Sequence, residues 1–223
     1  MQLMDELKQR FMKNKILTKE SLVIIFYGII YCVGFFGSFS PAWRNVVLPL
    51  SPFTLLLSFL GIVYTTPSPK RPIYLFILFS ATIGFVVEII GVHTGYLFGN
   101  YHYLQNLGVK IAEVPIVISI NWALITLGAA QIAALISKKK YARIFIAASV
   151  MLLFDIIMEP VAIKSQFWTW AEGIIPTYNY VCWFLVGLFL QYIYFQNIVH
   201  RWNKTLIFLF ICMTIFFIGL NFY

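Results

Sequence analysis

The sequence predicts an all-α membrane protein: a polytopic bundle of seven transmembrane helices with a cytoplasmic N-terminus and an external C-terminus. Composition is the first reason, because 61% of the 223 residues are hydrophobic and only 11% are charged, whereas soluble domains are about 25% charged. The second reason is that seven apolar runs are each long enough to cross about 30 Å of hydrocarbon. The third is the distribution of lysine and arginine over the turns between those runs.

The seven apolar runs follow one another in order along the chain. They lie at residues 21–39, 46–65, 72–91, 113–137, 142–163, 177–198 and 204–223. We expect the first run to be retained as a span, because it is too long for the core of a signal peptide and lacks a small-x-small cleavage site. The chain is therefore expected to consist of a cytoplasmic basic segment, residues 1–20, and a single transmembrane domain, residues 21–223.

The cationic residues give the orientation. Of the 16 lysines and arginines, 13 lie in the N-terminal segment or in the turns after the second, fourth and sixth runs, whereas Arg44, Lys110 and Lys164 fall singly in the other turns. Lysine and arginine collect in cytoplasmic loops, so the N-terminus is predicted inside and the C-terminus outside. Topology and anionic headgroups explain the net charge of +8, and no nucleic-acid partner is expected. We expect a multi-pass protein of the inner (cytoplasmic) cell membrane.

Five of the eight acidic residues lie within or beside the predicted spans, and the topology puts all five on the external side: Glu88, Glu113, Asp155, Glu159 and Glu172. A charge at the bilayer centre costs about 2.5–3.5 kcal/mol. These groups are therefore expected to face the bundle interior and to be paired, hydrated or protonated. A shared polar pocket accounts for the one-sided placement, and hydrogen bonding between helices is the structural alternative.

Two external hairpins carry these acids and resemble each other. Each has an acid followed by two isoleucines, then an aromatic loop with a late glycine, then proline, asparagine and tryptophan as the next span begins. Glu88 precedes Asp155 by 67 positions, and Trp122 precedes Trp183 by 61. Because both hairpins run in the same direction, a parallel internal repeat is predicted. Such a repeat would bring Glu88 and Asp155 to equivalent, facing positions, where differing environments could divide acid and base work.

The same residues carry a family resemblance. The segments "EIIGVHTGYLFGNYHY", "LGVKIAEVPIVISINW", "DIIMEPVAIKSQFWTW" and "GIIPTYNYVCWF" together cover roughly residues 84–187. In this region the chain resembles the carotenoid hydratase family of integral membrane proteins, which includes bisanhydrobacterioruberin hydratases. The resemblance implies addition of water to the terminal double bond of an acyclic carotenoid end group, such as that of lycopene or γ-carotene, giving a tertiary alcohol.

This chemistry requires a carboxyl acid, a group that orients water, and aromatic faces beside a developing cation. We predict Glu88 and Asp155 as the catalytic pair, without assigning acid and base, and three supporting or water-orienting side chains: Glu113, Glu159 and Asn179. The predicted substrate-binding residues are His93, Tyr96, Tyr101, Trp122, Trp168, Trp170 and Trp183. Hydration needs no cofactor, and no metal-type spacing is present. The expected partners are a carotenoid from the bilayer, water and other enzymes of the same pathway.

Two other readings stay open at this point. Intramembrane acids and repeated hairpins are also typical of proton-coupled transporters. Here, however, all of these acids are predicted on the external side of the membrane, and the cytoplasmic halves of the spans have no polar path. A non-catalytic assembly subunit, docking through its aromatic external loops, is the other alternative. A retinal-binding receptor is disfavoured because the last span has no lysine after Lys204 for a Schiff base.

Overall fold

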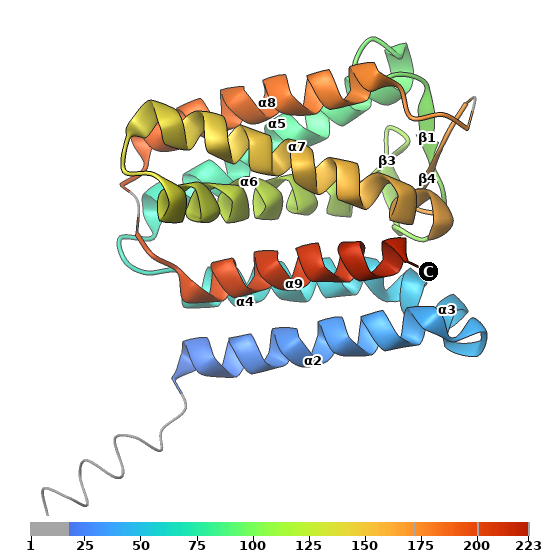
Figure 1. The fold of residues 1–223 in the computed structure, drawn as a ribbon, viewed down its shortest axis with the longest axis horizontal. Coiled ribbons are helices and arrows are strands. Elements are labelled where there is room, and N and C mark those ends of the chain that lie inside the picture. Colours follow the sequence, from blue (N-terminus) through green and yellow to red (C-terminus); the bar gives the residue numbers. More distant parts are fainter. Residues whose placement is uncertain (1–17, 172, 200, 223) are drawn as a thin grey trace, which may run out of the picture.

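The computed structural model describes residues 18–171, 173–199 and 201–222. Glu172 and most of the predicted N-terminal basic segment lie outside the described residues. Within the described ranges, seven helical segments are long and apolar enough to cross a membrane. This confirms the predicted all-α bundle of a multi-pass membrane protein (Figure 1).

The helices and strands follow the predicted order with short additions on the loops. Their bounds are α2 (Lys19–Phe39), α3 (Pro41–Val47), the 3₁₀ turn η1 (Leu48–Leu50), α4 (Ser51–Thr65), α5 (Arg71–Thr94), β1 (Tyr101–Tyr103), β2 (Lys110–Ile111), β3 (Val114–Pro115), α6 (Ile116–Ile136), α7 (Lys140–Lys164), β4 (Trp168–Trp170), α8 (Thr177–Asn197) and α9 (Lys204–Asn221).

Two spans begin at positions other than those predicted because of short elements that precede them. The second span begins earlier, because α3 and η1 lead directly into α4. The fourth begins later, because β2 and β3 pair as a short hairpin before α6. Glu113 lies in the turn of that hairpin with a φ of 63°, so it does not open the fourth span as predicted. Proline residues at the N-caps, Pro115 of α6 and Pro176 of α8, fix the extended entry into both helices.

The helices pack in layers. Figure 1 shows α4 and α9 between α2 on one side and α6 and α7 on the other. The strands, α3 and the C-terminal end gather at one end of the bundle, and the turns that carry the lysine and arginine clusters gather at the other. This arrangement matches the alternation that the charge distribution predicts.

The sidedness itself stays a prediction. A reporter fused after Tyr223 should be active outside the cytoplasm, since the cation-rich turns are expected to remain inside. A reporter placed between Lys138 and Lys139 should give the opposite signal. Cytoplasmic signals from both fusions would contradict the seven-span topology, since the two positions are separated by three helices.

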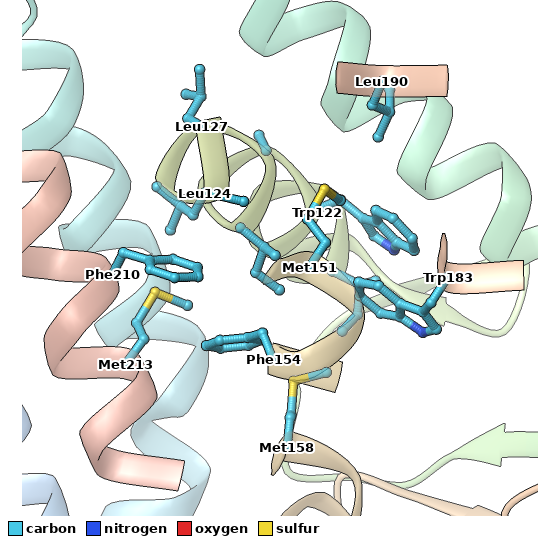
Figure 2. Close-up of a cluster of buried hydrophobic side chains, with 14 of the residues drawn as sticks. Trp122, Leu124, Leu127, Met151, Phe154, Met158, Trp183, Leu190, Phe210 and Met213 are labelled. Carbon is cyan, nitrogen blue, oxygen red and sulfur yellow. The ribbon is translucent and has the colours of Figure 1, made fainter. Parts of the chain in front are cut away.

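Helix α6 is the centre of the bundle, and most of its residues are buried. Its Ala and Gly residues are small, so neighbouring helices can approach it closely. Such close packing is what holds helices together in lipid, where no hydrophobic force acts between them. Figure 2 shows Phe210 and Met213 of α9 directed toward Leu124 of α6 and Phe154 of α7. The Phe154 and Phe210 rings lie 5.4 Å apart between centroids. By contrast, α2 buries little more than Tyr27 and Ser38, as expected of a helix that faces lipid.

Gly84 of α5 packs closely against Trp122 of α6. A Cβ at this position would lie 2.3 Å from Cγ of Trp122 and 2.4 Å from its Cβ. We expect Gly84→Ala to lower the free energy of unfolding by about 1–3 kcal/mol, because these atoms are close to the backbone and cannot swing away. Thermal unfolding in detergent measures this. Gly28→Ala is the matched control, since its nearest neighbour is 3.9 Å away, and equal stability losses in both variants would contradict the packing described.

Candidate active site

Three carboxyl groups of the spans line one small cavity near the end of the bundle that carries the strands. Glu88 of α5 and Asp155 and Glu159 of α7 contribute to its wall, together with Asn179 of α8 and a shell of aromatic rings. The cavity has a volume of about 20 Å³, which is room for one water molecule. All three carboxyl side chains are buried, Asp155 completely.

Glu88 is held by three hydrogen-bond donors. Its Oε2 accepts from the hydroxyls of Tyr101 at 2.5 Å and Tyr103 at 2.7 Å, and its Oε1 accepts from Nε1 of Trp122 at 2.9 Å. An ionised carboxylate is an acceptor only and can satisfy all three. Burial and then the Glu88 charge raise the pKa of both tyrosines, so their hydroxyls remain donors.

Glu159 has a second set of donors. Its Oε2 accepts from the indole Nε1 of Trp168 and of Trp170, both at 3.0 Å. Its Oε1 lies 3.5 Å from Nδ2 of Asn179, a longer contact. Like Glu88, this carboxylate accepts hydrogen bonds from the groups around it, which suits the ionised form.

Asp155 differs from both glutamates. Its Oδ2 accepts one hydrogen bond, from Nδ2 of Asn179 at 2.9 Å. Its Oδ1 is buried and has no hydrogen-bond partner among the described residues. Leaving a buried charged oxygen unsatisfied is costly, whereas a neutral carboxyl would carry its proton on that oxygen. The arrangement therefore suits a protonated Asp155 between two ionised glutamates.

The predicted repeat is visible in the strands that hold these groups. β1 pairs antiparallel with β4, with Tyr101 opposite Trp170 and Tyr103 opposite Trp168. Trp168 and Trp170 lie 67 positions after Tyr101 and Tyr103, the same offset that relates Asp155 to Glu88. A twofold rotation about the centre of the ladder thus exchanges the two strands.

The symmetry of the backbone is broken in the hydrogen bonds. Tyr101 and Tyr103 bind Glu88, but their counterparts Trp168 and Trp170 bind Glu159 instead of Asp155. Asp155, the counterpart of Glu88, has a single donor among the described residues, Asn179. Equivalent positions thus have different chemical environments, the condition under which two carboxyl groups take different roles.

Aromatic rings complete the cavity. Trp122 and Trp183, which correspond in the two hairpins, stack with their ring centroids 4.0 Å apart and an interplanar angle of 11°. Phe98 packs against both rings. A cation formed in the cavity would be stabilised by cation–π attraction where it meets the face of one of these electron-rich rings.

A comparison with protein families matches residues 51–222 to the model of the carotenoid biosynthesis protein family. The match covers well over half of the 223 residues. The chain belongs to this family. It therefore has a role in carotenoid biosynthesis, in agreement with the resemblance seen in the sequence. No curated protein and no solved structure gives a match.

In this carotenoid biosynthesis protein the structure brings nine of the twelve predicted site residues to the cavity, although their roles stay predictions: Glu88, Asp155, Glu159, Asn179, Tyr101, Trp122, Trp168, Trp170 and Trp183. Three are elsewhere. Glu113 is exposed in the β2–β3 turn. Exposed His93 contacts the carbonyl oxygen of Ala112 at 3.2 Å. Tyr96 is 78% exposed, because α5 ends at Gly95 in a left-handed conformation and turns the chain outward.

Five lining residues were not predicted from the sequence: Phe98, Tyr103, Ile118, Asn121 and Met158. Tyr103 could have been found, because Tyr101 and Tyr103 share the period-two spacing of Trp168 and Trp170, which puts both side chains on one face of a strand. Asn121 was signalled by its polarity within an apolar run. Its side chain lines the cavity, where the amide can bind water or a ligand group.

Proposed function

We propose that the protein is a cofactor-independent hydro-lyase that adds water to the terminal double bond of an acyclic carotenoid end group. Membership of a carotenoid biosynthesis family supplies the substrate class. The cavity supplies the chemistry: one carboxyl with a free oxygen, two carboxylates saturated with donors, space for one water and an aromatic wall.

In the proposed reaction, Asp155 is the acid. Its proton passes to the less substituted alkene carbon, where the π electrons form the new C–H bond and leave a tertiary cation on the neighbouring carbon. Water attacks that cation and forms the C–O bond. The oxonium proton then returns to the Asp155 carboxylate, so the acid is regenerated. Hydration is redox-neutral overall, and it consumes only the alkene and water.

The other groups stabilise the charges that this reaction creates. Glu88 and Glu159 provide negative charge near the cation, which is worth more in a site that excludes bulk water. The stacked Trp122 and Trp183 rings add cation–π attraction. Asn179 donates to Oδ2 of Asp155, which orients the carboxyl and keeps its other oxygen available. Asn121 is the residue we assign to holding the water.

The observation that carries the proposal is Oδ1 of Asp155, which has no hydrogen-bond partner in the described ranges of the chain. A completely buried carboxyl oxygen without a donor suits a proton carrier better than a purely structural hydrogen bond between helices. The test is expression in a lycopene-producing host, followed by mass analysis of the pigments. Products heavier than lycopene by one or two waters are expected. Unchanged lycopene, with the protein present in the membrane, would exclude the activity on this substrate.

A further inference from the structure

A second cavity adjoins the carboxyl cavity and is of a different character. It has a volume of about 80 Å³, and its walls come from α2, η1, α4 and α9 on one side and from α6 and α7 on the other. The two cavities share four lining residues: Ile118, Asn121, Met158 and Trp168. Figure 2 shows Met158 and Met213, two lining residues of this second cavity, on facing helices α7 and α9.

The lining of this cavity is mostly apolar, and two of its hydroxyl groups donate to nearby backbone carbonyls. Ser38 donates to the carbonyl of Gly34 at 2.7 Å, and Thr54 donates to the carbonyl of Leu50 at 3.3 Å. Both therefore satisfy their hydroxyls on their own helix. The wall contributed by α2 runs over residues 30–38, a length of about 12 Å along the helix axis.

From this juxtaposition we propose that the second cavity binds the terminal hydrocarbon segment of the acyclic carotenoid and presents its last double bond to Asp155 past Asn121 and Met158. An apolar ligand that moves from lipid into a protein gains binding free energy only through close packing. A cavity about as long as one chain end, and adjoining the carboxyl cavity, therefore suits a branched hydrocarbon terminus. The carotenoid body would remain in the bilayer.

This inference rests on the proposed function, and it assigns a binding role to a helix that the family match does not include. The match begins at residue 51, whereas Ile30, Tyr31, Gly34 and Ser38 of α2 line the cavity. The carboxyl cavity is built without α2. Substitutions in α2 can therefore separate binding of the hydrocarbon from the acid chemistry.

The experiment fills the cavity from two different helices. Gly34→Leu on α2 and Thr54→Phe on α4 would each place side-chain atoms in the space, and a Cβ at Gly34 makes only an ordinary contact, 3.5 Å from Phe216. Gly28→Leu, on α2 but outside the cavity lining, is the matched control. Each is combined with Asp155→Asn to prevent turnover, and lycopene that remains bound to the purified protein is measured by its absorption.

We expect bound lycopene to fall on the order of tenfold in both filled variants, since the added side chains remove the close packing between the chain end and the cavity walls, and to remain at the Asp155→Asn level in the Gly28→Leu control. Thermal unfolding identifies a variant that fails to fold, and the lycopene binding of the other filled variant then tests the inference. Undiminished lycopene binding in the folded filled variants would overturn the inference and assign the space to a lipid acyl chain. Failure of the proposed function is a different result: the parental protein, with Asp155 intact, would then form no hydrated product from lycopene.

Discussion

Asp155→Asn is expected to abolish hydration while leaving the fold and carotenoid binding intact. The amide keeps the volume of the carboxyl and can still accept from Asn179 through its oxygen, but it has no acidic proton. General acid catalysis contributes typically about 10²–10⁴ in rate, so turnover should fall by at least that range. The measurement is conversion of lycopene by purified protein in detergent or nanodiscs, with bound pigment and thermal unfolding recorded on the same samples.

Glu113→Gln is the matched control for this variant. Glu113 is a carboxyl at the same end of the bundle, but it is exposed in the β2–β3 turn and lies outside the cavity lining. Its amide variant should turn over at the parental rate. Parental turnover in Asp155→Asn, or equal losses in both variants, would contradict the role of Asp155 as the acid.

Glu88→Gln is expected to have the second-largest effect, for a different reason. Glu88 accepts from Tyr101, Tyr103 and Trp122. In the glutamine variant, one carboxylate oxygen is replaced by an NH₂ group, which faces either the tyrosine hydroxyls or the Trp122 indole N–H. At least one buried donor would therefore lose its acceptor. That loss costs about 1–3 kcal/mol in stability, and the negative charge near the cation is removed as well. We expect a fall in turnover of orders of magnitude together with a lower unfolding temperature.

Tyr103→Phe separates the two contributions of Glu88. It removes one donor and leaves the carboxylate in place, with Tyr101 and Trp122 still bound to it. Its loss of turnover should therefore be much smaller than that of Glu88→Gln. If Glu88→Gln retains near-parental turnover and only loses stability, Glu88 is an anchor for β1 and α6 and has no part in the chemistry.

The helices were predictable from the sequence because their signals are local. Apolar length fixes each span, and the positive charges in alternate turns fix their order across the membrane. The short strands were not predictable, because segments of two or three residues are stabilised by pairing and not by their own propensity. The β2–β3 hairpin is the clearest case, since it moves Glu113 from the start of a span to an exposed turn.

The sequence was enough to predict which acids share a pocket, but it was not enough to predict the role of each acid. Glu88, Asp155 and Glu159 were found because carboxyl groups in apolar runs are rare. The donors of each carboxyl depend on the register of β1 against β4, which no local pattern encodes. For the same reason the sequence could not show that Trp168 and Trp170 bind Glu159, or that Oδ1 of Asp155 has no partner among the residues that the structure describes.

The most direct measurement of the central claim is conversion of lycopene by the purified parental protein in water labelled with heavy oxygen. Acid-catalysed hydration takes its oxygen from water, so each hydroxyl formed should carry the label, the product should form without dioxygen, and Asp155→Asn should form none. An unlabelled hydroxyl, a requirement for dioxygen, or a product that has gained no oxygen would contradict the hydration mechanism.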